Sequence, residues 1–439
     1  MATVPPPQDI LWNRSSPPPP DCGRLEGEMT ADVAIVGAGL TGLRAAVTLA
    51  EAGVETVVLD AERIGFGASG RSGGQCNPMW RATPDDLVRK YGAAQAERLI
   101  ETTLSAADDL FDDIRRYDID CGAEQNGWIQ AAHTRRAARK LERLRDGWQA
   151  VGAQIDTLSG PEVHEAAGSP AYEFALLHHK GGFVHPLALT RGFAKTAQRH
   201  GAWLFEESPV TGMERGGGKW RVQTPDGVVT CDTVILSTNA YTDGLWPGLR
   251  QTVVPMVSII LATAPLTPEQ QAVTLPGRRT IADTRLAIFY SRYDAENRLV
   301  FGCIGSADDV GAWGGHGRLA SALTTVFPHL SDTPVECTWS GRIAVTPDMM
   351  PRLHAPAPGV LAGLGYSGRG IAMTSVMGRA LASKVLGGRN SELPFPVSAI
   401  QPIPLQALSR RMVSVMAPMM SLRDRLAVAW DRIGAGQRK

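Results

Sequence analysis

The sequence predicts an α/β fold, α+β overall, in which a parallel-sheet domain is interleaved with an antiparallel-sheet domain and followed by C-terminal helices. Three observations predict it. A run of apolar β-formers at 32–36 leads through a glycine-rich turn into a helical pattern at 43–52, the local order of a parallel sheet. Within 219–237, two strand-like segments of alternating apolar and polar residues are separated by a Pro-Asp-Gly turn. Further strand-like runs follow between 252 and 303.

The remaining elements follow from the same patterns. Strands are expected at 54–59, 203–214, 287–293, 298–301 and 360–364, and helices at 84–116, 134–150, 187–200 and 371–386. Residues 403–433 form an amphipathic pattern that Pro418 is expected to divide into two helices.

Composition narrows the class of protein. The 439 residues suggest two lobes, and 44% hydrophobic with 20% charged residues is ordinary for a globular enzyme. Lys plus Arg equals Asp plus Glu at 44 each, so we expect no nucleic-acid partner. The six cysteines are scattered, without Cys-x-x-Cys or zinc-ligand spacing, so we expect a reducing compartment and no metal site. Neither a signal peptide nor a membrane-spanning run is recognisable, and a cytoplasmic enzyme is expected.

The turn after the first strand is a phosphate-binding motif. In Gly37-Ala38-Gly39-Leu40-Thr41-Gly42 the first glycine makes the turn, the second admits a pyrophosphate, and the third lets helix and strand pack closely. The helix N-terminus offers free N–H groups to the phosphates. Asp60, eighteen residues past Gly42, is placed to accept hydrogen bonds from a ribose. The motif alone predicts a dinucleotide, either NAD or FAD, while a ligand-free turn is the alternative.

A second glycine-rich stretch, Gly65-Phe-Gly-Ala-Ser-Gly-Arg-Ser-Gly-Gly-Gln75, resembles the corresponding loop of the D-amino-acid-oxidase-like flavoprotein superfamily, nearest to its γ-glutamylputrescine oxidase branch. The resemblance covers nearly the whole chain. Its other motifs stand in the family's order: Trp12, Thr238-Asn239-Ala240, Trp339-Ser-Gly-Arg342, Thr346-Pro-Asp348 and Gly365-Tyr-Ser-Gly-Arg-Gly370. The resemblance implies FAD in a Rossmann-type domain interleaved with the substrate domain.

The resemblance also implies domain bounds and cofactor-binding residues. The bounds are a lead-in at 1–30, an FAD-binding domain at 31–85, 180–250 and 340–390, a substrate domain at 86–179 and 251–339, and a helical tail at 391–439. The cofactor-binding residues are expected to be Gly37, Ala38, Gly39, Leu40, Thr41, Gly42, Asp60, Ala61, Gly67, Ala68, Ser69, Gly70, Arg71, Ser72, Gly73, Gly74, Gln75, Val210, Thr238, Asn239, Ala240, Gly341, Gly365, Tyr366, Ser367, Gly368, Arg369, Gly370 and Ile371.

Three departures from the family pattern bear on the flavin. The first loop has no His, and Gly341 stands where relatives with a covalent flavin carry Cys, while Cys337 does not align. We therefore expect non-covalent FAD. Val300 matches the position at which oxygen-using relatives carry Lys beneath the flavin. The resemblance therefore leaves oxygen and another electron acceptor both open.

The family oxidises a C–N bond by hydride transfer to the flavin, so the resemblance implies a small amine or amino-acid-like substrate and no dedicated strong base. Candidate catalytic residues are Arg71, Arg369, Tyr290 and Arg292. The alternatives are a surface loop charge for Arg71, a solvent-facing residue at a helix start for Arg369, and a core or sheet-surface role for Tyr290 and Arg292. His185 is expected to be structural. Aromatic residues that either line the pocket or belong to the core are Trp80, Phe289 and Trp313.

Two other classes stay open at this point. Arginines beside the apolar stripe of 403–433 suit a dehydrogenase that docks on a membrane or on an electron acceptor such as a quinone or a protein, but a helix packed on the protein body explains the same pattern. A non-catalytic flavoprotein subunit is the other possibility. The sequence assigns neither the substrate nor the oligomeric state.

Overall fold

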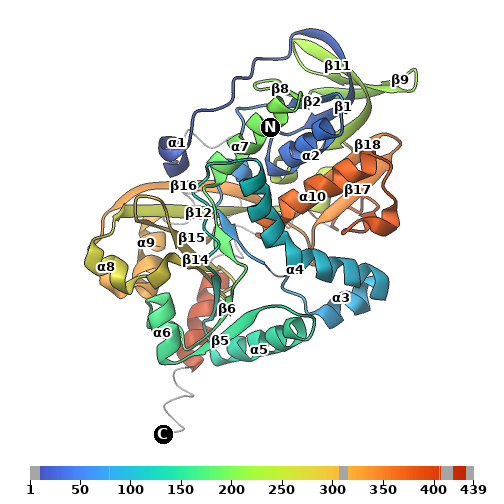
Figure 1. Cartoon of the computed structure of the whole chain (residues 1–439). Helices are drawn as coiled ribbons and strands as arrows, with labels where there is room; N and C mark the ends of the chain where they lie inside the picture. Colours follow the sequence, from blue (N-terminus) through green and yellow to red (C-terminus); the bar gives the residue numbers. More distant parts are fainter. Residues whose placement is uncertain (1–9, 79, 306–314, 405, 407–418, 432–439) are drawn as a thin grey trace.

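The computed structural model describes residues 10–78, 80–305, 315–404, 406 and 419–431 (Figure 1). Within these residues the strands form a nine-stranded sheet, an eight-stranded sheet and a two-stranded ribbon. The two large sheets lie in separate lobes, with α4 between them and α7 on the nine-stranded side (Figure 1). No helix in the described part of the chain has the length and apolar character needed to cross a bilayer.

The nine-stranded sheet carries the predicted strand–turn–helix motif. Its central strands β18, β11, β1, β2 and β8 run parallel, each in register with the next. The bounds are β1 Gly27–Val36, β2 Thr56–Leu59, β8 Trp203–Phe205, β9 Gly212–Gly216, β10 Lys219–Gln223, β11 Gly227–Leu236, β17 Arg352–Ala357, β18 Val360–Leu364 and β19 Val397–Ser398. The predicted parallel sheet is confirmed.

The eight-stranded sheet is mainly antiparallel and has the order β16-β12-β15-β14-β13-β4-β6-β5. The bounds are β4 Trp128–Ala132, β5 Ile155–Ser159, β6 Phe174–His178, β12 Val254–Pro265, β13 Thr280–Asp283, β14 Phe289–Tyr293, β15 Arg298–Gly305 and β16 Val335–Val345. Successive side chains of a strand point to opposite faces. On β15, Leu299 and Phe301 enter one apolar cluster, whereas Val300 enters another, beside Trp12 and Trp339.

Helices cover both sheets. The bounds are α1 Leu11–Ser15, α2 Leu40–Glu51, α3 Pro84–Tyr91, α4 Ala93–Arg116, α5 Arg135–Gln149, α6 Pro161–Ala167, α7 Pro186–Arg199, α8 Pro268–Val273, α9 Gly315–Val326 and α10 Gly370–Val385. Residues 419–431 form a further helix. The ribbon pairs β3 Gln75–Cys76 with β7 Gly182–Phe183.

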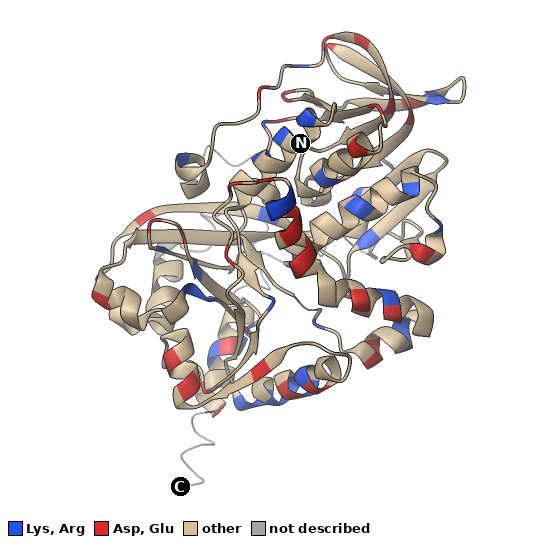
Figure 2. Ribbon diagram, viewed as in Figure 1, with Lys and Arg blue, Asp and Glu red and all other residues tan. Residues whose placement is uncertain are grey.

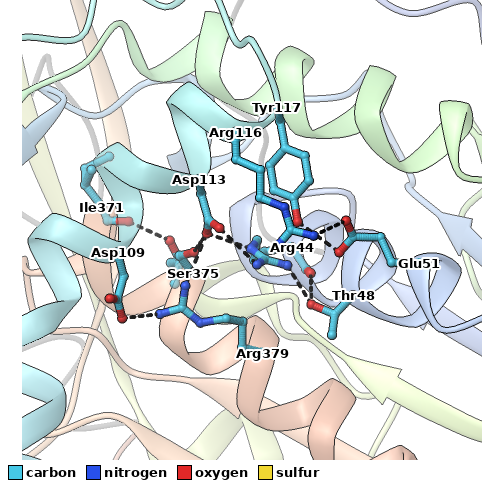
Figure 3. A network of polar contacts seen from close by, with 11 residues as sticks. Arg44, Thr48, Glu51, Asp109, Asp113, Arg116, Tyr117, Ile371, Ser375 and Arg379 are labelled. Carbon is cyan, nitrogen blue, oxygen red and sulfur yellow. Dashed lines mark hydrogen bonds and ion pairs between the residues drawn. The ribbon is translucent and has the colours of Figure 1, made fainter.

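The helix that follows the phosphate loop is held by close packing and by one buried carboxylate. A Cβ on Gly378 of α10 would lie 2.7 Å from the Thr41 carbonyl oxygen of α2, so only glycine allows this approach. Asp113 of α4 accepts hydrogen bonds from Arg44 Nε at 2.8 Å, Ser375 Oγ at 3.0 Å and Arg379 NH1 at 3.2 Å (Figure 3). A single carboxylate therefore joins α2, α4 and α10.

Several boundaries differ from the predicted ones. β1 begins at Gly27, inside the lead-in that was expected to be extended, and α1 also lies there with Trp12 fully buried. The predicted helix at 84–116 is interrupted at Gly92, whose φ of +75° ends one helix and starts the next. Residues 203–214 contain two strands rather than one. In the predicted tail, β19 pairs with β17, and Pro418 lies outside the described residues.

We predict that Asp113→Ala lowers the free energy of unfolding by about 3–5 kcal/mol, because the substitution leaves the Arg44 guanidinium buried without its carboxylate. Asp112→Ala is the matched control, since Asp112 is exposed and pairs only with Arg115 one turn away; its cost should stay within about 0.5 kcal/mol. Chemical denaturation measures both. Equal destabilisation by the two variants would contradict the assigned role of Asp113.

Candidate functional site

One cavity of about 1210 Å³ connects the two sheets. At one end its wall is the phosphate loop at the carboxyl end of β1, together with Asp60 after β2. At the other end its wall is a face of the eight-stranded sheet, with Ser258 of β12 and Tyr290 of β14. A long ligand bound in this cavity would touch both domains.

The phosphate loop has the shape that a pyrophosphate requires. Gly37 has φ +106°, and a Cβ on Gly42 would lie 2.1 Å from the Gly37 carbonyl oxygen, so both positions need glycine. Gly39 is the N-cap of α2 and provides no side-chain cap. The Leu40 N–H at the start of α2 donates to Ser69 Oγ of the second glycine-rich loop at 3.0 Å, and the start of the helix lines the cavity, as anion sites at helix N-termini do.

Asp60 stands at the ribose position that the motif predicts. Its Oδ2 accepts a hydrogen bond from the Ala38 N–H at 2.7 Å, and its Oδ1 accepts one from the Glu62 N–H at 3.0 Å. Burial raises the pKa of Asp60 to about 6, against the effect of these two hydrogen bonds. The carboxylate is therefore ionised, and able to accept from ribose hydroxyls, only above about pH 6.

The second glycine-rich loop is fixed through three consecutive carbonyl groups. The Trp339 indole N–H donates to the Arg71 carbonyl at 2.8 Å, and the Trp12 indole N–H donates to the Ser72 carbonyl at 2.9 Å. Arg292 Nε donates to the Gly73 carbonyl. Donors from the N-terminal segment, β14 and β16 therefore hold this loop against the cavity.

The turn before α10 forms the cavity wall opposite this loop. The Gly365 N–H donates to Asn239 Oδ1 at 3.0 Å, and the Tyr366 hydroxyl lies 2.6 Å from the Thr41 hydroxyl. Arg369, next to the start of α10, is buried. Its burial, and secondly the charge of Arg81, lower the pKa of Arg369 well below its usual range. An anion bound between these two arginines would relieve that repulsion.

On the sheet side, Tyr290 fills the space left by two glycines. A Cβ on Gly73 or on Gly302 would lie 2.7 or 2.2 Å from its ring. Its hydroxyl lies 2.7 Å from Ser258 Oγ. Burial raises the pKa of the Tyr290 phenol above its ordinary value, so the group is protonated at neutral pH.

Most of the predicted cofactor-binding residues line this cavity. The exceptions are Gly42, Gly70, Arg71, Ala240, Gly341 and Gly365, which are absent from the wall. A Cβ on Gly70 would lie 2.0 Å from the Gly65 carbonyl oxygen, and one on Gly341 would lie 3.1 Å from the Arg71 Cβ. These glycines do not line the cavity themselves, but they allow the backbone segments next to its wall to approach each other closely.

Two of the four catalytic candidates, Arg71 and Arg292, do not line the cavity. Arg71 is buried, with Nε donating to the Phe66 carbonyl at 2.6 Å and NH1 to the Ser340 carbonyl at 3.2 Å. Arg292 donates to the carbonyls of Gly73, Val184 and Tyr293. Neither side chain lines the cavity, because their donors are directed at backbone oxygens. Tyr290 and Arg369 do line it.

The structure also places Trp80, Phe289, Val300 and His185. Trp80 and Phe289 belong to apolar clusters and are absent from the cavity wall, so the core alternative holds for both; Trp313 lies outside the described residues. Val300 packs beside Trp12 and Trp339 and is not among the residues that line the cavity. His185, which is expected to be structural, caps α7: its Nδ1 accepts the Ala188 N–H.

Several cavity residues were missed by sequence reasoning. They include Arg81, Gln130, Ser258, Thr284, Arg342 and Met349. Arg342 belongs to the motif Trp339-Ser-Gly-Arg342, and that motif was the sequence signal that could have identified it. The others come from separate strands and loops, and a strand pattern alone does not tell which face meets a ligand.

A Gly-rich loop, a buried ribose-directed carboxylate and a cavity that continues to a second sheet define a dinucleotide-dependent enzyme. Residues 32–384 match the model of the family described as FAD dependent oxidoreductase (DAO). The chain belongs to this family.

Named relatives and solved structures agree with this assignment. The chain is 32% identical to gamma-glutamylputrescine oxidoreductase of Escherichia coli K12, over 92% of this chain and 95% of that protein. It is also 32% identical to the probable oxidoreductase OrdL of Haemophilus influenzae, over 81% and 83%. The fold matches glycine oxidase of Geobacillus kaustophilus with a TM-score of 0.70 at 23% identity, over 84% of this chain and 98% of that structure. The predicted fold and family are confirmed.

We predict that FAD binds the apoprotein more weakly as pH falls through about 6, because protonated Asp60 no longer offers an ionised acceptor to the ribose. The dissociation constant should rise by up to about tenfold per pH unit below that value. Fluorescence titration between pH 4.5 and 8 measures it (roughly the range over which an Asp with this pKa titrates). Asp60→Asn should bind weakly with a flat pH profile; an unchanged slope in that variant would sink the assignment.

Proposed function

We propose that this protein oxidises the C–N bond of a small amine or amino-acid-like substrate that carries an anionic group. The supporting observation is the continuous cavity, which links the dinucleotide loop to the Tyr290 and Ser258 wall of the second sheet. The names of two similar proteins, gamma-glutamylputrescine oxidoreductase and glycine oxidase, indicate amine and amino-acid chemistry in those proteins.

FAD, when bound, would supply the acceptor for a hydride from the carbon next to nitrogen. We assign the chain's own residues to positioning the reactants and name no catalytic base among them. Among the described cavity-lining residues there is no His, and the Tyr290 phenol stays protonated at neutral pH. This wall therefore suits a substrate that arrives as a neutral amine, and the resulting imine is hydrolysed to an aldehyde or keto product.

Arg81 and Arg369 are the residues that we assign to the anionic group of the substrate. Both line the cavity, and the charge of Arg81 lowers the pKa of Arg369. A carboxylate between two guanidinium groups makes charge-assisted hydrogen bonds and removes their mutual repulsion. Its other end would then reach towards Tyr290.

We also propose that FAD is held without a covalent bond. The described residues that line the cavity include neither Cys nor His, the side chains to which relatives attach a flavin. The cofactor would be held by the phosphate loop, by Asp60, by the second glycine-rich loop and by the turn at Gly368-Arg369-Gly370. The Asp60 titration requires reversible removal of FAD, and flavin that cannot be removed contradicts this point.

The second candidate function is a dehydrogenase that passes electrons to a quinone or a protein instead of oxygen. The described residues of the eight-stranded sheet that line the cavity near Tyr290, including Met256, Ser258, Ile304 and Arg342, contain no Lys. Positive charge there comes from arginine alone. This favours reoxidation by an acceptor other than oxygen.

Anaerobic reduction of the bound flavin tests the proposed function. γ-Glutamylated amines, N-methyl amino acids, D-amino acids and simple polyamines should be compared, and substrates with a carboxylate should bleach the flavin fastest. Arg81→Met should raise their half-saturating concentration about ten- to hundredfold, the value of one charged hydrogen bond, and leave an uncharged amine unaffected. Arg63→Met, an exposed arginine outside the cavity, is the control.

Reduction only by hydroxy acids, or by none of these compounds, would reject C–N oxidation. Equal effects of Arg81→Met on charged and uncharged amines would reject the assigned anion site. Reoxidation by oxygen and by an artificial dye is followed in the same samples, and rapid peroxide formation would reject the dehydrogenase alternative.

A further inference from the structure

The helix at 419–431 is attached to the substrate domain by its acidic residues. Asp424 is buried, and its carboxylate accepts the N–H groups of Leu286 and Ala287 at 3.1 and 3.2 Å. Asp431 accepts the N–H of Arg135, the first residue of α5, at 3.0 Å. Met420, near the start of the helix, lines the cavity. These contacts fix which side of the helix faces the protein.

The opposite side of this helix exposes large apolar side chains. Met419, Leu422, Leu426 and Trp430 are 62%, 57%, 51% and 75% exposed. Their spacing of three, four and four residues places them in one stripe, which we call the apolar stripe. If this helix simply packed on the protein body, its large apolar residues would be expected to face inward, because burying them contributes most of the free energy of packing. Here the buried contacts are polar and the apolar stripe is left outside.

A second stripe, on α5, is strongly basic. Arg136, Arg139, Lys140 and Arg143 are exposed and recur at helical spacing, so they share one face, which we call the basic stripe. No ion pair joins them to any residue that the structure describes. Figure 2 shows Lys and Arg gathered along α5. Four unpaired cations on one helical face make a surface that attracts anions.

Both helices that carry the stripes border the same cavity, although no residue of the apolar stripe itself lines it. Lys140 and Arg143 line it from α5, and Met420 lines it from the C-terminal helix. The contact between Arg135 and Asp431 joins the start of α5 to the end of that helix. The helix that carries the basic stripe and the helix that carries the apolar stripe therefore contact each other at the edge of the cavity.

We propose that these two contacting helices rest on an anionic lipid surface, with the apolar stripe among the acyl chains and the basic stripe against the headgroups. A soluble polyanion would use the basic stripe but not the apolar one, and a second copy of the chain would bring the same cations against each other. A bilayer with anionic lipid satisfies both stripes together. The inference does not depend on which substrate the enzyme oxidises.

Co-sedimentation of the FAD-loaded enzyme with lipid vesicles tests the proposal. Binding should be strong to phosphatidylcholine vesicles that contain phosphatidylglycerol, weak to phosphatidylcholine alone, and reduced by salt. Arg136→Glu with Arg139→Glu, and separately Leu422→Ser with Leu426→Ser, should each lower the partition coefficient by at least about tenfold. None of these four residues lines the cavity, so flavin reduction by substrate in solution should be unchanged.

The matched control is Lys195→Glu with Arg250→Glu, which changes the net charge equally at exposed positions away from both stripes. It should bind vesicles nearly as well as the wild type. Vesicles with brominated acyl chains should quench tryptophan fluorescence less in Trp430→Phe than in the wild type.

No binding to anionic vesicles, or equal loss in the control and in the stripe variants, would overturn the proposal. A smaller oligomer on size exclusion in the Leu422→Ser, Leu426→Ser variant, without any vesicle binding by the wild type, would assign the apolar stripe to a second copy instead. Failure of substrate to reduce the flavin would reject the proposed function and leave the vesicle result standing.

Discussion

The site depends on the anchoring of three consecutive carbonyl groups, those of Arg71, Ser72 and Gly73. Each accepts a hydrogen bond from a buried side chain that belongs to a distant segment: Trp339, Trp12 and Arg292. A loop this rich in glycine has little conformational preference of its own, and its ordering costs entropy. The three donors impose one conformation and connect both sheets at the place where the loop lines the cavity.

The same contacts explain why the first residues of the chain belong to the site. Trp12 is fully buried in a cluster with Trp339 and Val300, and Arg292 lies over its ring at 4.6 Å. Burial lowers the pKa of Arg292 to about 10, which still leaves it charged at neutral pH. Its charge is balanced by carbonyl dipoles and an aromatic face rather than by a direct carboxylate contact.

The sequence was most informative where a motif is local. Gly37, Gly39, Gly42 and Asp60 lie within one strand–helix–strand unit, so spacing alone predicted their places, and parallel strands put them at one sheet edge. It was least informative for residues whose roles depend on distant partners. Arg71 and Arg292 have the charge of catalytic residues, but the carbonyls that hold them include distant ones, Ser340 for Arg71 and Gly73 and Val184 for Arg292.

The substrate wall was unpredictable for a related reason. Tyr290 and Phe289 are neighbours on β14, yet one lines the cavity and the other packs in the core. A register shift of one residue would exchange them, and only the pairing of β14 with β15 decides between the two. Arg81 follows β3 in an irregular segment, where no periodic pattern exists to mark it.

Residues of α5 and of the helix at 419–431 also line the cavity. Lys140 and Arg143 reach the cavity from α5, whose buried face packs Leu141, Leu144 and Trp148 into the core, and Met420 reaches it from the helix at 419–431. The C-terminal helix reaches that position through Asp424 and Asp431, so its attachment is polar and specific.

The affinity of the apoprotein for FAD in Trp339→Phe is the measurement that tests this account most directly. The substitution keeps an aromatic ring but removes the N–H that holds the Arg71 carbonyl, at a cost of about 1–3 kcal/mol. The account predicts that the dissociation constant for FAD rises about tenfold or more, whereas Trp220→Phe, which loses an indole bond to the Pro358 carbonyl away from the cavity, leaves it unchanged. Equal FAD affinity in Trp339→Phe and the wild type would contradict the claim that anchored carbonyls shape the site.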